Sequence, residues 1–437
     1  MTKLSSPSLI EEVSSPKALK IAWDSLNKGN PKSRGLSRET LEEFKNSLET
    51  QILEISKLLK SNKYKFNGVR AVLIPKKAEG EFRPLRIADI RDRLVQKSLS
   101  LTLEKLLSSK YELKNDCSFA YQEGLGVENA IKKAIEHFQN GNRIILEADI
   151  KKFFDTVNRE KLLGKIYADL PDNTINNLIE QSIAQNVGNL DEVTHEYQHY
   201  FTESINGIPQ GNSLSPLLAN IYLSDFDQRM IKERLCLVRY ADDFIILCKT
   251  TKDAHRAYEI AKEELEDKLG LELHPLPNPP HQKSSKTRII DPFHHEFSFL
   301  SIRFDGKSVW VNPKKLNDLL EKINTITDIE RYKTDRDYKG LLTILVRLKN
   351  LLEGWLASYK FVDVDREFPE IDNYINHKLL QVFNKLQYKI KSSHTDTMKI
   401  KSTGKFVQAF NRAQRINTGI FFCADFINSL DRNQIKV

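Results

Sequence analysis

The chain has few cysteines, no signal-peptide pattern and no long apolar run. Four cysteines are scattered among its 437 residues without a CxxC pair: Cys117, Cys236, Cys248 and Cys423. This scarcity argues against a disulfide framework and a zinc site, and it favours a reducing compartment. The longest purely apolar run near the middle of the chain, Phe244–Cys248, is far below the ~18 residues of a membrane span. Residues 1–13 have no apolar segment of the signal-peptide kind. We therefore expect a cytoplasmic protein with no membrane partner.

The charge of the chain is basic and unevenly spread. Lys and Arg number 67 against 59 Asp and Glu, which gives a net charge of +8. From residue 374 onward eleven basic residues stand against three acidic ones, so the excess lies near the C-terminus. A basic balance favours a polyanionic partner, usually nucleic acid. The basic tail either binds structured RNA through its phosphates or is an ordinary solvated face. Its aromatic residues, suited to stacking on bases or to packing, are Phe406, Phe410, Phe421 and Phe422.

The most informative stretch is Tyr240-Ala241-Asp242-Asp243, which lies between the apolar runs 235–238 and 244–247. This pattern predicts a β-hairpin that carries both acids at its tip. Adjacent carboxylates repel each other, and withdrawing them from water makes the repulsion costlier unless a cation compensates. The alternative is a plain surface turn, where Asp is common because it hydrogen-bonds its own backbone.

A second acid ends another apolar strand. Residues 144–148 are predicted to form this strand, and Asp149 follows it directly. If the two strands are neighbours, their carboxylates meet near one point and can bridge two Mg²⁺ ions ~3.5–4 Å apart. Taken alone, Asp149 is equally typical of a helix N-cap.

Between these acids lies a loop rich in glycine and proline. Residues 207–216 read Gly-Ile-Pro-Gln-Gly-Asn-Ser-Leu-Ser-Pro, and a long helix is predicted over 214–234. Ser213 or Ser215 is suited to cap that helix, and Pro216 suits its first turn.

Several blocks in this order resemble the palm of reverse transcriptases. Motifs A, B and C of that palm are matched by Asp149…Phe154, by Pro209-Gln210-Gly211…Ser215-Pro216 and by Tyr240-Ala241-Asp242-Asp243. The flanking blocks resemble the fingers, motif D, primer grip and thumb of group II intron-type bacterial reverse transcriptases, and they are residues 74–86, 92–96, 118–126, 285–288, 299–304 and 347–359. The resemblance covers about residues 65–385.

The resemblance implies an α+β right-hand polymerase with fingers, a palm built on an antiparallel sheet, and a helical thumb. The implied parts are an N-terminal helical extension over 1–64, fingers and palm over 65–305, a helical thumb over 306–390 and a basic tail over 391–437. The implied activity is RNA-directed DNA polymerisation, with dNTPs as substrates and a DNA product.

Residue roles follow from the matching positions. The metal site implied by the family, for two Mg²⁺ ions with Mn²⁺ as the alternative, consists of Asp149, the Ile150 carbonyl, Asp242 and Asp243. The implied dNTP-binding residues are Lys76, Arg83, Phe154, Gln210 and Lys286. Phe154 stands at the position of the steric gate that excludes a ribose 2′-OH, and Lys286 is a candidate proton donor to pyrophosphate. The alternatives are solvated surface charges for Lys76, Arg83 and Lys286, and plain core packing for Phe154.

The sequence departs from group II intron proteins after the thumb. Neither an HNH endonuclease nor an RNase H carboxylate set is evident, which resembles the free-standing, defence-associated bacterial reverse transcriptases. That class implies copying of a dedicated non-coding RNA in anti-phage defence. Two other functions stay open, namely an intron-type maturase that acts as an RNA-binding protein, and template-independent or protein-primed DNA synthesis.

Overall fold

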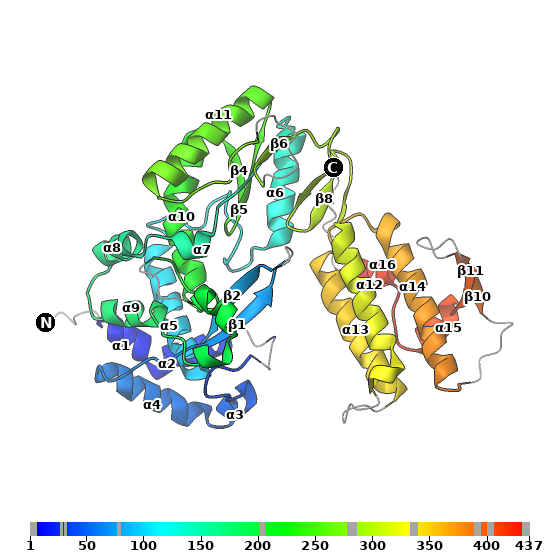
Figure 1. The fold of residues 1–437 in the computed structure, drawn as a ribbon, viewed down its shortest axis with the longest axis horizontal. Coiled ribbons are helices and arrows are strands. Elements are labelled where there is room, and N and C mark those ends of the chain that lie inside the picture. Colours follow the sequence, from blue (N-terminus) through cyan, green and yellow to red (C-terminus); the bar gives the residue numbers. More distant parts are fainter. Residues whose placement is uncertain are drawn as a thin grey trace, which may run out of the picture. The chain divides into compact units, whose positions relative to one another are not determined.

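The structure is a computed structural model that describes residues 7–26, 29, 33–76, 80–201, 206–277, 286–332, 340–388, 395–399 and 406–430. It contains two compact units, shown with their elements in Figure 1. The first unit comprises Met1–Gly126 and Ile145–Ile289, and the second comprises Val127–Ile144 and Ile290–Val437. Among the described residues, no helix is both long and apolar enough to cross a membrane.

The first unit begins with four helices, of which α1 and α2 pack on the long helix α5 and on α4. Their bounds are α1 Leu9–Ser14, α2 Pro16–Asp24, α3 Leu41–Asn46, α4 Leu48–Lys60 and α5 Ile90–Leu107. The apolar periodicity of residues 41–59 is typical of one amphipathic helix, but Ser47 leaves the helical conformation (φ −115°, ψ 16°) and separates α3 from α4. A capping box of Thr40 and Glu43 starts α3. The ring of Phe44 then stacks on Trp23 with centroids 5.4 Å apart.

Strands β1 (Arg70–Pro75) and β2 (Phe82–Ile87) form an antiparallel hairpin that pairs Pro75 with Phe82. The shorter elements that complete the first unit are α7 Phe153–Thr156, α8 Arg159–Asp169, α9 Asn176–Ile183, two 3₁₀ turns at Leu190–Glu192 and His195–Phe201, and a π-helical stretch at Glu263–Lys268.

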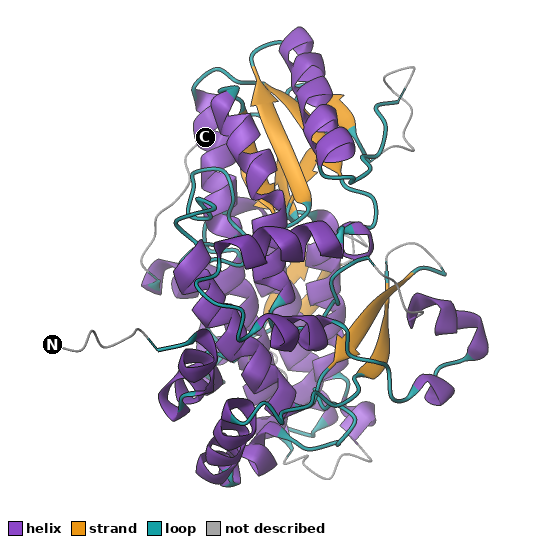
Figure 2. Ribbon diagram, turned by 90° about the vertical axis from the view of Figure 1, so that its left-hand side faces the viewer, coloured by secondary structure: helices purple, strands orange, loops and turns teal. Residues whose placement is uncertain are grey.

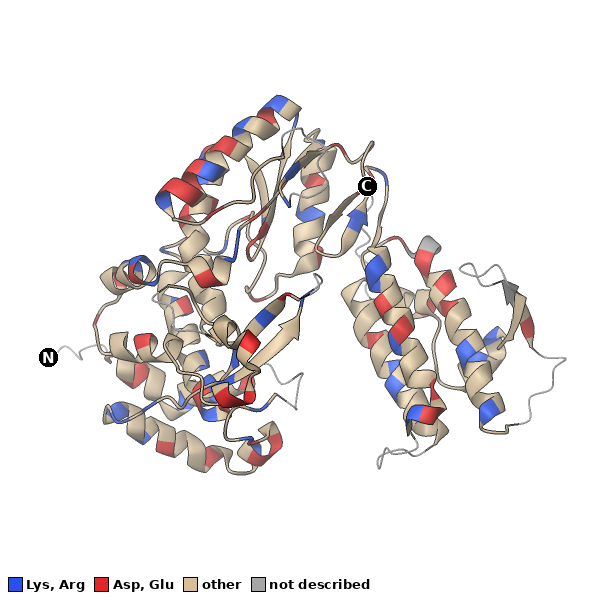
Figure 3. Cartoon of the chain, in the orientation of Figure 1, with Lys and Arg blue, Asp and Glu red and all other residues tan. Residues whose placement is uncertain are grey.

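The central sheet of the first unit has the order β4-β5-β3-β6. Its strands are β3 Ile144–Asp149, β4 Cys236–Tyr240, β5 Asp243–Cys248 and β6 Arg288–Ile290. Two helices pack on it, α10 (Ser215–Lys232) against β4 and α11 (Thr251–Lys262) against β5, as Figure 2 shows for the orange strands. Figure 3 shows charges of both signs along α11, as expected for the solvated face of a surface helix. The apolar residues of β4 and β5 are therefore buried, and polar groups stand at the ends of the strands.

The second unit combines a small sheet with long helices. Its first elements are α6 Val127–Gln139, β7 Phe297–Phe299, β8 Ile302–Phe304, β9 Val309–Val311, α12 Pro313–Thr327, a 3₁₀ turn at Ile329–Tyr332, α13 Leu341–Ser358 and α14 Val364–Lys385. The sequence predicted one strand over 297–304, but Leu300 and Ser301 have positive φ (52° and 67°) and turn the chain. The result is an antiparallel sheet of order β7-β8-β9.

The described part of the C-terminal segment folds onto the long helices. It contains β10 Asp396–Lys399, β11 Phe406–Ala409, α15 Arg412–Asn417 and α16 Cys423–Ser429, with α16 against α13 and α14 and β11 against α14. Arg415 is fully buried and donates to Asp372 at 2.7 Å, so it is not free to bind an RNA phosphate. Phe410 is buried as well, which makes it a packing residue. Several basic residues of the predicted RNA-binding tail lie outside the described residues: Lys389, Lys391, Lys401, Lys405, Arg432 and Lys436.

The α+β class is confirmed, because helices accompany antiparallel strand pairs in both units. The predicted division at residues 64, 305 and 390 stays a prediction. The chain passes from one compact unit to the other at different positions, namely after residues 126, 144 and 289.

A buried carboxylate ties the start of α5 to its surroundings. Asp92 is fully buried and accepts hydrogen bonds from Tyr64 Oη (2.7 Å), Asn67 N (2.9 Å) and Gln185 Nε2 (3.2 Å). Burial raises the pKa of Asp92 to about 6, in spite of these bonds. The folded protein therefore binds a proton at Asp92 more tightly than the unfolded chain does.

The raised pKa predicts a pH-dependent change in stability. The contribution of Asp92 is fully present below its ordinary pKa near 4 and is lost as the pH rises through about 6, a change of about 3 kcal/mol. The side chain of Asp92→Asn cannot ionise, so this variant should not lose that stability. We therefore expect its free energy of unfolding, compared with that of the original chain, to be more favourable at pH 7 than at pH 4. Urea denaturation at both pH values measures this difference. Asp24→Asn, at the exposed end of α2, serves as control, and parallel pH profiles for all three proteins would contradict the prediction.

Candidate active site

The predicted hairpin is present and carries its acids at the tip. Strands β4 and β5 pair antiparallel, and the pairing of Tyr240 with Asp243 leaves Ala241 and Asp242 as a two-residue turn. Ala241 adopts the left-handed region with φ +60°. The turn therefore holds an alanine in a conformation that glycine prefers.

Asp149 ends strand β3, which lies next to β5 in the sheet. It is not a helix N-cap, because α7 starts at Phe153 and Lys152 occupies the cap position. A short antiparallel bridge holds the segment that follows Asp149: Lys151 N donates to Glu272 O at 2.8 Å and His274 N donates to Asp149 O at 3.1 Å. The carbonyls of Asp149 and Glu272 accept these two bonds, and the carbonyl of the buried Ile150 accepts neither of them.

The carboxylates act on one another across the strand ends. Burial raises the pKa of Asp242, and the charge of Asp149 adds to the rise. Withdrawal from bulk water raises the pKa of Asp243 to about 6, with further repulsion from Asp242, Asp149 and Glu147, although the end of the Asp243 side chain stays exposed. Glu147 is itself paired with Arg288, whose Nε lies 2.6 Å from the carboxylate. The site is thus a region of concentrated and incompletely compensated negative charge.

Two cationic or potentially cationic side chains contact Asp149. Lys286 Nζ lies 2.6 Å from Asp149 Oδ2, and His274 Nε2 lies 3.4 Å from the same oxygen. Burial opposes ionisation of Lys286 and is the largest single effect, but the hydrogen bond to Asp149 and the charges of Asp149, Asp243 and Glu81 together raise the pKa of the ammonium group. Burial lowers the pKa of His274 despite the nearby carboxylate, which favours neutral imidazole. Lys286 is therefore the cation that partly compensates Asp149.

The hairpin β1–β2 brings two of the predicted dNTP-binding residues to this region. Arg83 is exposed on β2, and its charge lowers the pKa of Asp242 against the effect of burial. Lys76 follows β1, where its Nζ lies 3.7 Å from Glu81 Oε2 and its charge acts on Asp155. Arg83 and Lys76 are thus solvent-accessible cations, as phosphate-binding residues must be, and Arg83 is the one whose charge reaches Asp242.

The loop over residues 207–216 packs tightly on its neighbours. Ile208 N donates to Phe154 O at 2.8 Å, and Arg86 N donates to Gln210 O at 2.8 Å. Gln210 is half-buried, and its position is thereby tied to β2. Gly211 has φ +101°, and a Cβ there would lie 2.9 Å from Arg86 O. The loop needs glycine at this position for both reasons.

The predicted serine cap of α10 is wrong. The helix starts at Ser215 with Leu214 at the cap position and no side-chain cap bond. Ser215 Oγ donates instead to Pro209 O at 2.7 Å, which closes the loop on itself. Pro216 lies in the first turn, as predicted.

Phe154 lies in α7, directly after the bend that follows Asp149. Its ring is half-buried and makes an edge contact with the fully buried Phe153, with centroids 5.4 Å apart. Phe153 is therefore a core residue, whereas Phe154 packs in the core with only part of its ring. The accessible part of the Phe154 ring remains available to contact a substrate.

The chemistry of the donors fits Mg²⁺, which prefers oxygen ligands and carboxylates in particular. The raised pKa values of Asp242 and Asp243 show that their negative charge lacks a sufficient cationic partner. Within the described part of the chain, however, no three Asp, Glu, His or Cys side chains are already close enough together to hold a metal ion. A metal ion at Asp149 Oδ2 would have to compete with Lys286 for that oxygen.

Three residues near the site were not anticipated. Tyr121 is 48% exposed with φ +63°, and Asp242 and Asp243 help burial to raise its pKa. His274 follows a stretch whose spacing carries no pattern, so nothing in the sequence indicates its contact with Asp149. Arg239 did leave a signal, because a charged residue inside an otherwise apolar strand must find buried partners.

Residues 74–290 match the family model described as reverse transcriptase (RNA-dependent DNA polymerase). The matched segment contains Asp149, Phe154, Gln210 and the turn with Asp242 and Asp243, in the order that the sequence blocks predicted. Residues 74–290 belong to the reverse transcriptase family. The strand ends described above accordingly lie within a reverse transcriptase domain, where the sequence predicted its palm, and the assignment of the β1–β2 hairpin to the fingers stays a prediction.

Similar proteins extend the comparison. The "Uncharacterized 91 kDa protein in cob intron" of Schizosaccharomyces pombe is 31% identical over 270 residues, which are 60% of this chain and 31% of that protein. The "Group II intron-encoded protein LtrA" of Lactococcus lactis subsp. cremoris is 31% identical over 217 residues, which are 49% of this chain and 34% of that protein. Among solved structures, a chain of a partial Cas6-RT-Cas1–Cas2 complex has 25% identity and a TM-score of 0.35, and the match covers 60% of this chain and 42% of that one. The resemblance to group II intron-encoded proteins is confirmed, and the chain spans about a third of the length of these curated relatives.

The close contact at Gly207 generates a prediction for the palm. Gly207 has φ +88°, and a Cβ there would lie 2.8 Å from Phe154 O, so Gly207→Ala must push α7 or the loop away. We expect the free energy of unfolding to fall by about 1–3 kcal/mol, measured by urea denaturation.

Gly164→Ala is the matched control, because Gly164 lies in helix α8 with nothing within 4 Å of an added Cβ and no positive φ. This change should stabilise the protein by about 0.5–1 kcal/mol. Equal effects of the two substitutions would show that the loop does not press on α7.

Proposed function

We propose that this chain is an RNA-directed DNA polymerase whose chemistry takes place at Asp149, Asp242 and Asp243. The observation that supports this is the meeting of the carboxylates at the ends of the adjacent strands β3 and β5, within electrostatic reach of one another. Like charges gathered in this way are unfavourable unless the protein recruits cations. A polymerase site requires such an acidic centre beside cations for a triphosphate, and Arg83 and Lys286 are such cations.

In this proposal the two carboxylates Asp149 and Asp242 hold two Mg²⁺ ions, with Mn²⁺ as the alternative, and Asp243 and the Ile150 carbonyl assist. The metals supply activation of a 3′-hydroxyl and stabilisation of the departing pyrophosphate. Lys286 and His274 contact the same oxygen of Asp149 and would therefore compete with a metal ion for it.

The remaining roles concern the dNTP. Arg83 and Lys76 bind its phosphates, Arg83 with a forked pair of donors and Lys76 as a point charge. Gln210, fixed to β2 by its own carbonyl, lines the nucleotide pocket. Phe154 lies against the sugar and excludes a 2′-OH. Lys286, once displaced from Asp149, is placed to donate a proton to the pyrophosphate.

The finer assignment is that the enzyme copies a dedicated, structured non-coding RNA in the cytoplasm and acts in anti-phage defence. The excess of Lys and Arg after residue 374 supports it, because basic residues bind the phosphates of RNA. An intron-type maturase that only binds RNA, and template-independent or protein-primed synthesis, are the alternatives.

The proposed activity predicts that carboxamides at the turn stop DNA synthesis. We expect Asp242→Asn combined with Asp243→Asn to lower the rate of dNTP incorporation by on the order of a thousandfold or more, because the metals lose their charged ligands. Primer extension on an RNA template measures this rate. Asp225→Asn is the control, since Asp225 is an exposed residue of α10 paired only with Lys165 in the contacts described.

Sequencing the RNA and DNA that copurify with the active and the inactive protein tests the finer assignment. cDNA complementary to one bound RNA, present only with the active protein, supports templated copying of a partner RNA. Homopolymer without a template identifies untemplated synthesis, and bound RNA without any DNA product in either sample identifies the maturase alternative.

The role of Phe154 predicts a change in sugar selectivity. Phe154→Ala removes the accessible ring, so we expect the preference for dNTPs over rNTPs, measured as a ratio of kcat/KM values, to fall by at least about tenfold. Phe154→Tyr keeps the bulk of the ring and should retain the preference. An unchanged preference in Phe154→Ala would leave Phe154 as a packing residue only.

A further inference from the structure

Arg239 is a charged residue in the interior of the palm. Its side chain is 1% exposed in strand β4, and only Tyr240 separates it from the turn that carries the acids. A guanidinium group has five N–H donors, and burial without partners would leave each of them costly. All five have acceptors here: Nε and Nη2 donate to the two oxygens of Asp227, Nη2 also to Ser118 Oγ (2.8 Å), and Nη1 to Asn220 Oδ1 (3.2 Å) and Ala241 O (2.9 Å).

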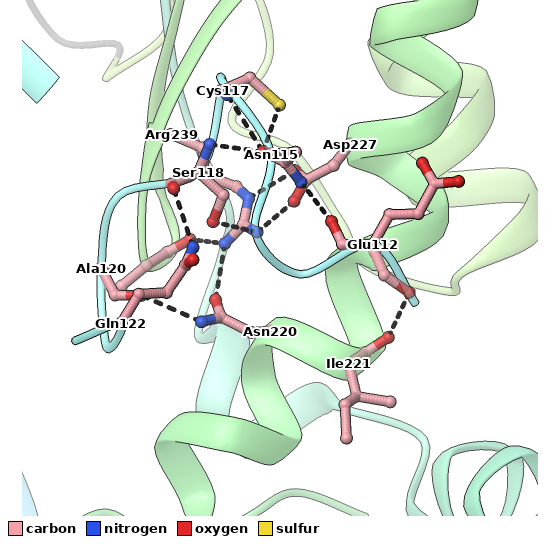
Figure 4. Close-up of polar contacts among 12 residues, drawn as sticks. Glu112, Asn115, Cys117, Ser118, Ala120, Gln122, Asn220, Ile221, Asp227 and Arg239 are labelled. Carbon is pink, nitrogen blue, oxygen red and sulfur yellow. Dashed lines mark hydrogen bonds and ion pairs between the residues drawn. The ribbon is translucent and has the colours of Figure 1, made fainter. Parts of the chain in front are cut away.

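These acceptors come from three separate parts of the chain, and Figure 4 labels those on Asp227, Asn220 and Ser118. Asp227 and Asn220 lie on helix α10, Ser118 lies in the loop before α6, and Ala241 lies in the turn itself. The loop is also attached to β4 through its backbone, because Arg239 N donates to Cys117 O at 2.7 Å and Phe119 N donates to Arg239 O at 3.0 Å. The guanidinium group is therefore held from several sides and has little freedom to move.

The bond to Ala241 is the one that reaches the acidic turn. Ala241 occupies the first position of a two-residue hairpin turn at φ +60°, where a residue with a Cβ is strained by roughly 1–3 kcal/mol. Nη1 of Arg239 binds the carbonyl of this residue, which belongs to the peptide group that joins Ala241 to Asp242. That contact fixes the plane of the peptide, and with it the direction in which Asp242 leaves the turn.

Stability alone is a poor reason for this arrangement. A buried ion pair often stabilises a fold no better than apolar side chains of the same volume, because both charges lose their hydration. The neighbouring positions of β4, Leu237 and Val238, are fully buried apolar residues that fill such space without that cost. What Arg239 adds, and an apolar residue cannot, is a donor aimed at the Ala241 carbonyl.

We propose that Arg239 is a positioning residue, which holds the Ala241–Asp242 turn in the conformation that presents Asp242 and Asp243 to divalent metal ions. The inference rests on the proposed polymerase function. It assigns to Arg239 no contact with substrate or metal.

The second unit offers a matched control. Arg415 is likewise fully buried and donates to a carboxylate, Asp372, and to an amide oxygen, that of Asn376, at 2.7 and 3.1 Å. Arg415→Lys and Arg239→Lys therefore make the same chemical change in the same kind of surroundings. They differ in that only Arg239 contacts the turn with the acids.

The experiment compares the full chain with Arg239→Lys, Arg415→Lys and Asp242→Asn. Lysine keeps the charge opposite Asp227 but lacks the fork that reaches Ala241 as well. Mn²⁺ binding, measured by electron paramagnetic resonance, is expected to weaken roughly 10-fold to 100-fold in Arg239→Lys and to stay unchanged in Arg415→Lys. Hydrogen exchange of the peptide 238–247 should quicken in Arg239→Lys alone. The Mg²⁺ concentration for half-maximal dNTP incorporation should rise by the same factor as the Mn²⁺ dissociation constant.

A loss of Mn²⁺ affinity below about tenfold, or an equal loss in both lysine variants, overturns the proposal. If Arg239→Lys does not fold, Asn220→Ala replaces it. This variant keeps the ion pair, removes one of the two acceptors that hold Nη1 and also removes the bond from Asn220 Nδ2 to Ala120 O. It must still weaken Mn²⁺ binding and quicken exchange at 238–247. If the original chain incorporates no dNTP at any Mg²⁺ concentration, the polymerase function fails. The Mn²⁺ and exchange measurements still decide the role of Arg239 in that case.

Discussion

The mutual repulsion of carboxylates at the ends of two adjacent strands is the constraint on which the rest of the palm depends. Asp149 and Asp242 must be close to act together, yet closeness and partial burial raise the free energy of their charged forms. The fold can maintain this only if rigid elements hold the strands and if cations are at hand. Both conditions are met: α10 packs on β4 and α11 packs on β5, and Lys286 lies against Asp149. The surrounding structure thus holds these carboxylates together although their mutual repulsion is unfavourable.

The loop over residues 207–216 packs closely against its neighbours and so helps to hold the acidic centre in place. Gly207 and Gly211 both have positive φ, and both lie where a Cβ would collide with a backbone carbonyl, that of Phe154 and that of Arg86. These two contacts connect the loop to α7 on one side and to β2 on the other. The proposed nucleotide-binding residues Phe154 and Gln210 therefore occupy positions defined by backbone contacts, which do not depend on side-chain rotamers.

The sequence predicts well what depends on local patterns. Two apolar runs around a polar hinge predicted the hairpin with Asp242 at its tip, and helix α10, with Pro216 in its first turn, begins within a residue of its expected start. It fails where a single backbone angle or a distant contact decides. Ser47 breaks a helix whose apolar period continues, and the turn at Leu300 divides a predicted strand, although neither residue is a glycine or proline. The contact of His274 with Asp149 joins positions 125 residues apart, and no local pattern encodes it.

The two buried arginines show where the fold requires the greatest geometric accuracy. In the described structure Arg415 leaves its buried Nε without a partner, a deficit worth about 1–3 kcal/mol, and the second unit tolerates it. Arg239 has an acceptor for every donor, drawn from a loop, a helix and the turn. A residue needed only to fill space or to balance one carboxylate would not require the additional contacts with Ser118 and Ala241. An acceptor for every N–H of Arg239 is expected if small displacements of the turn at Asp242 impair function. Metal binding by Asp242, as proposed above, would make such displacements harmful.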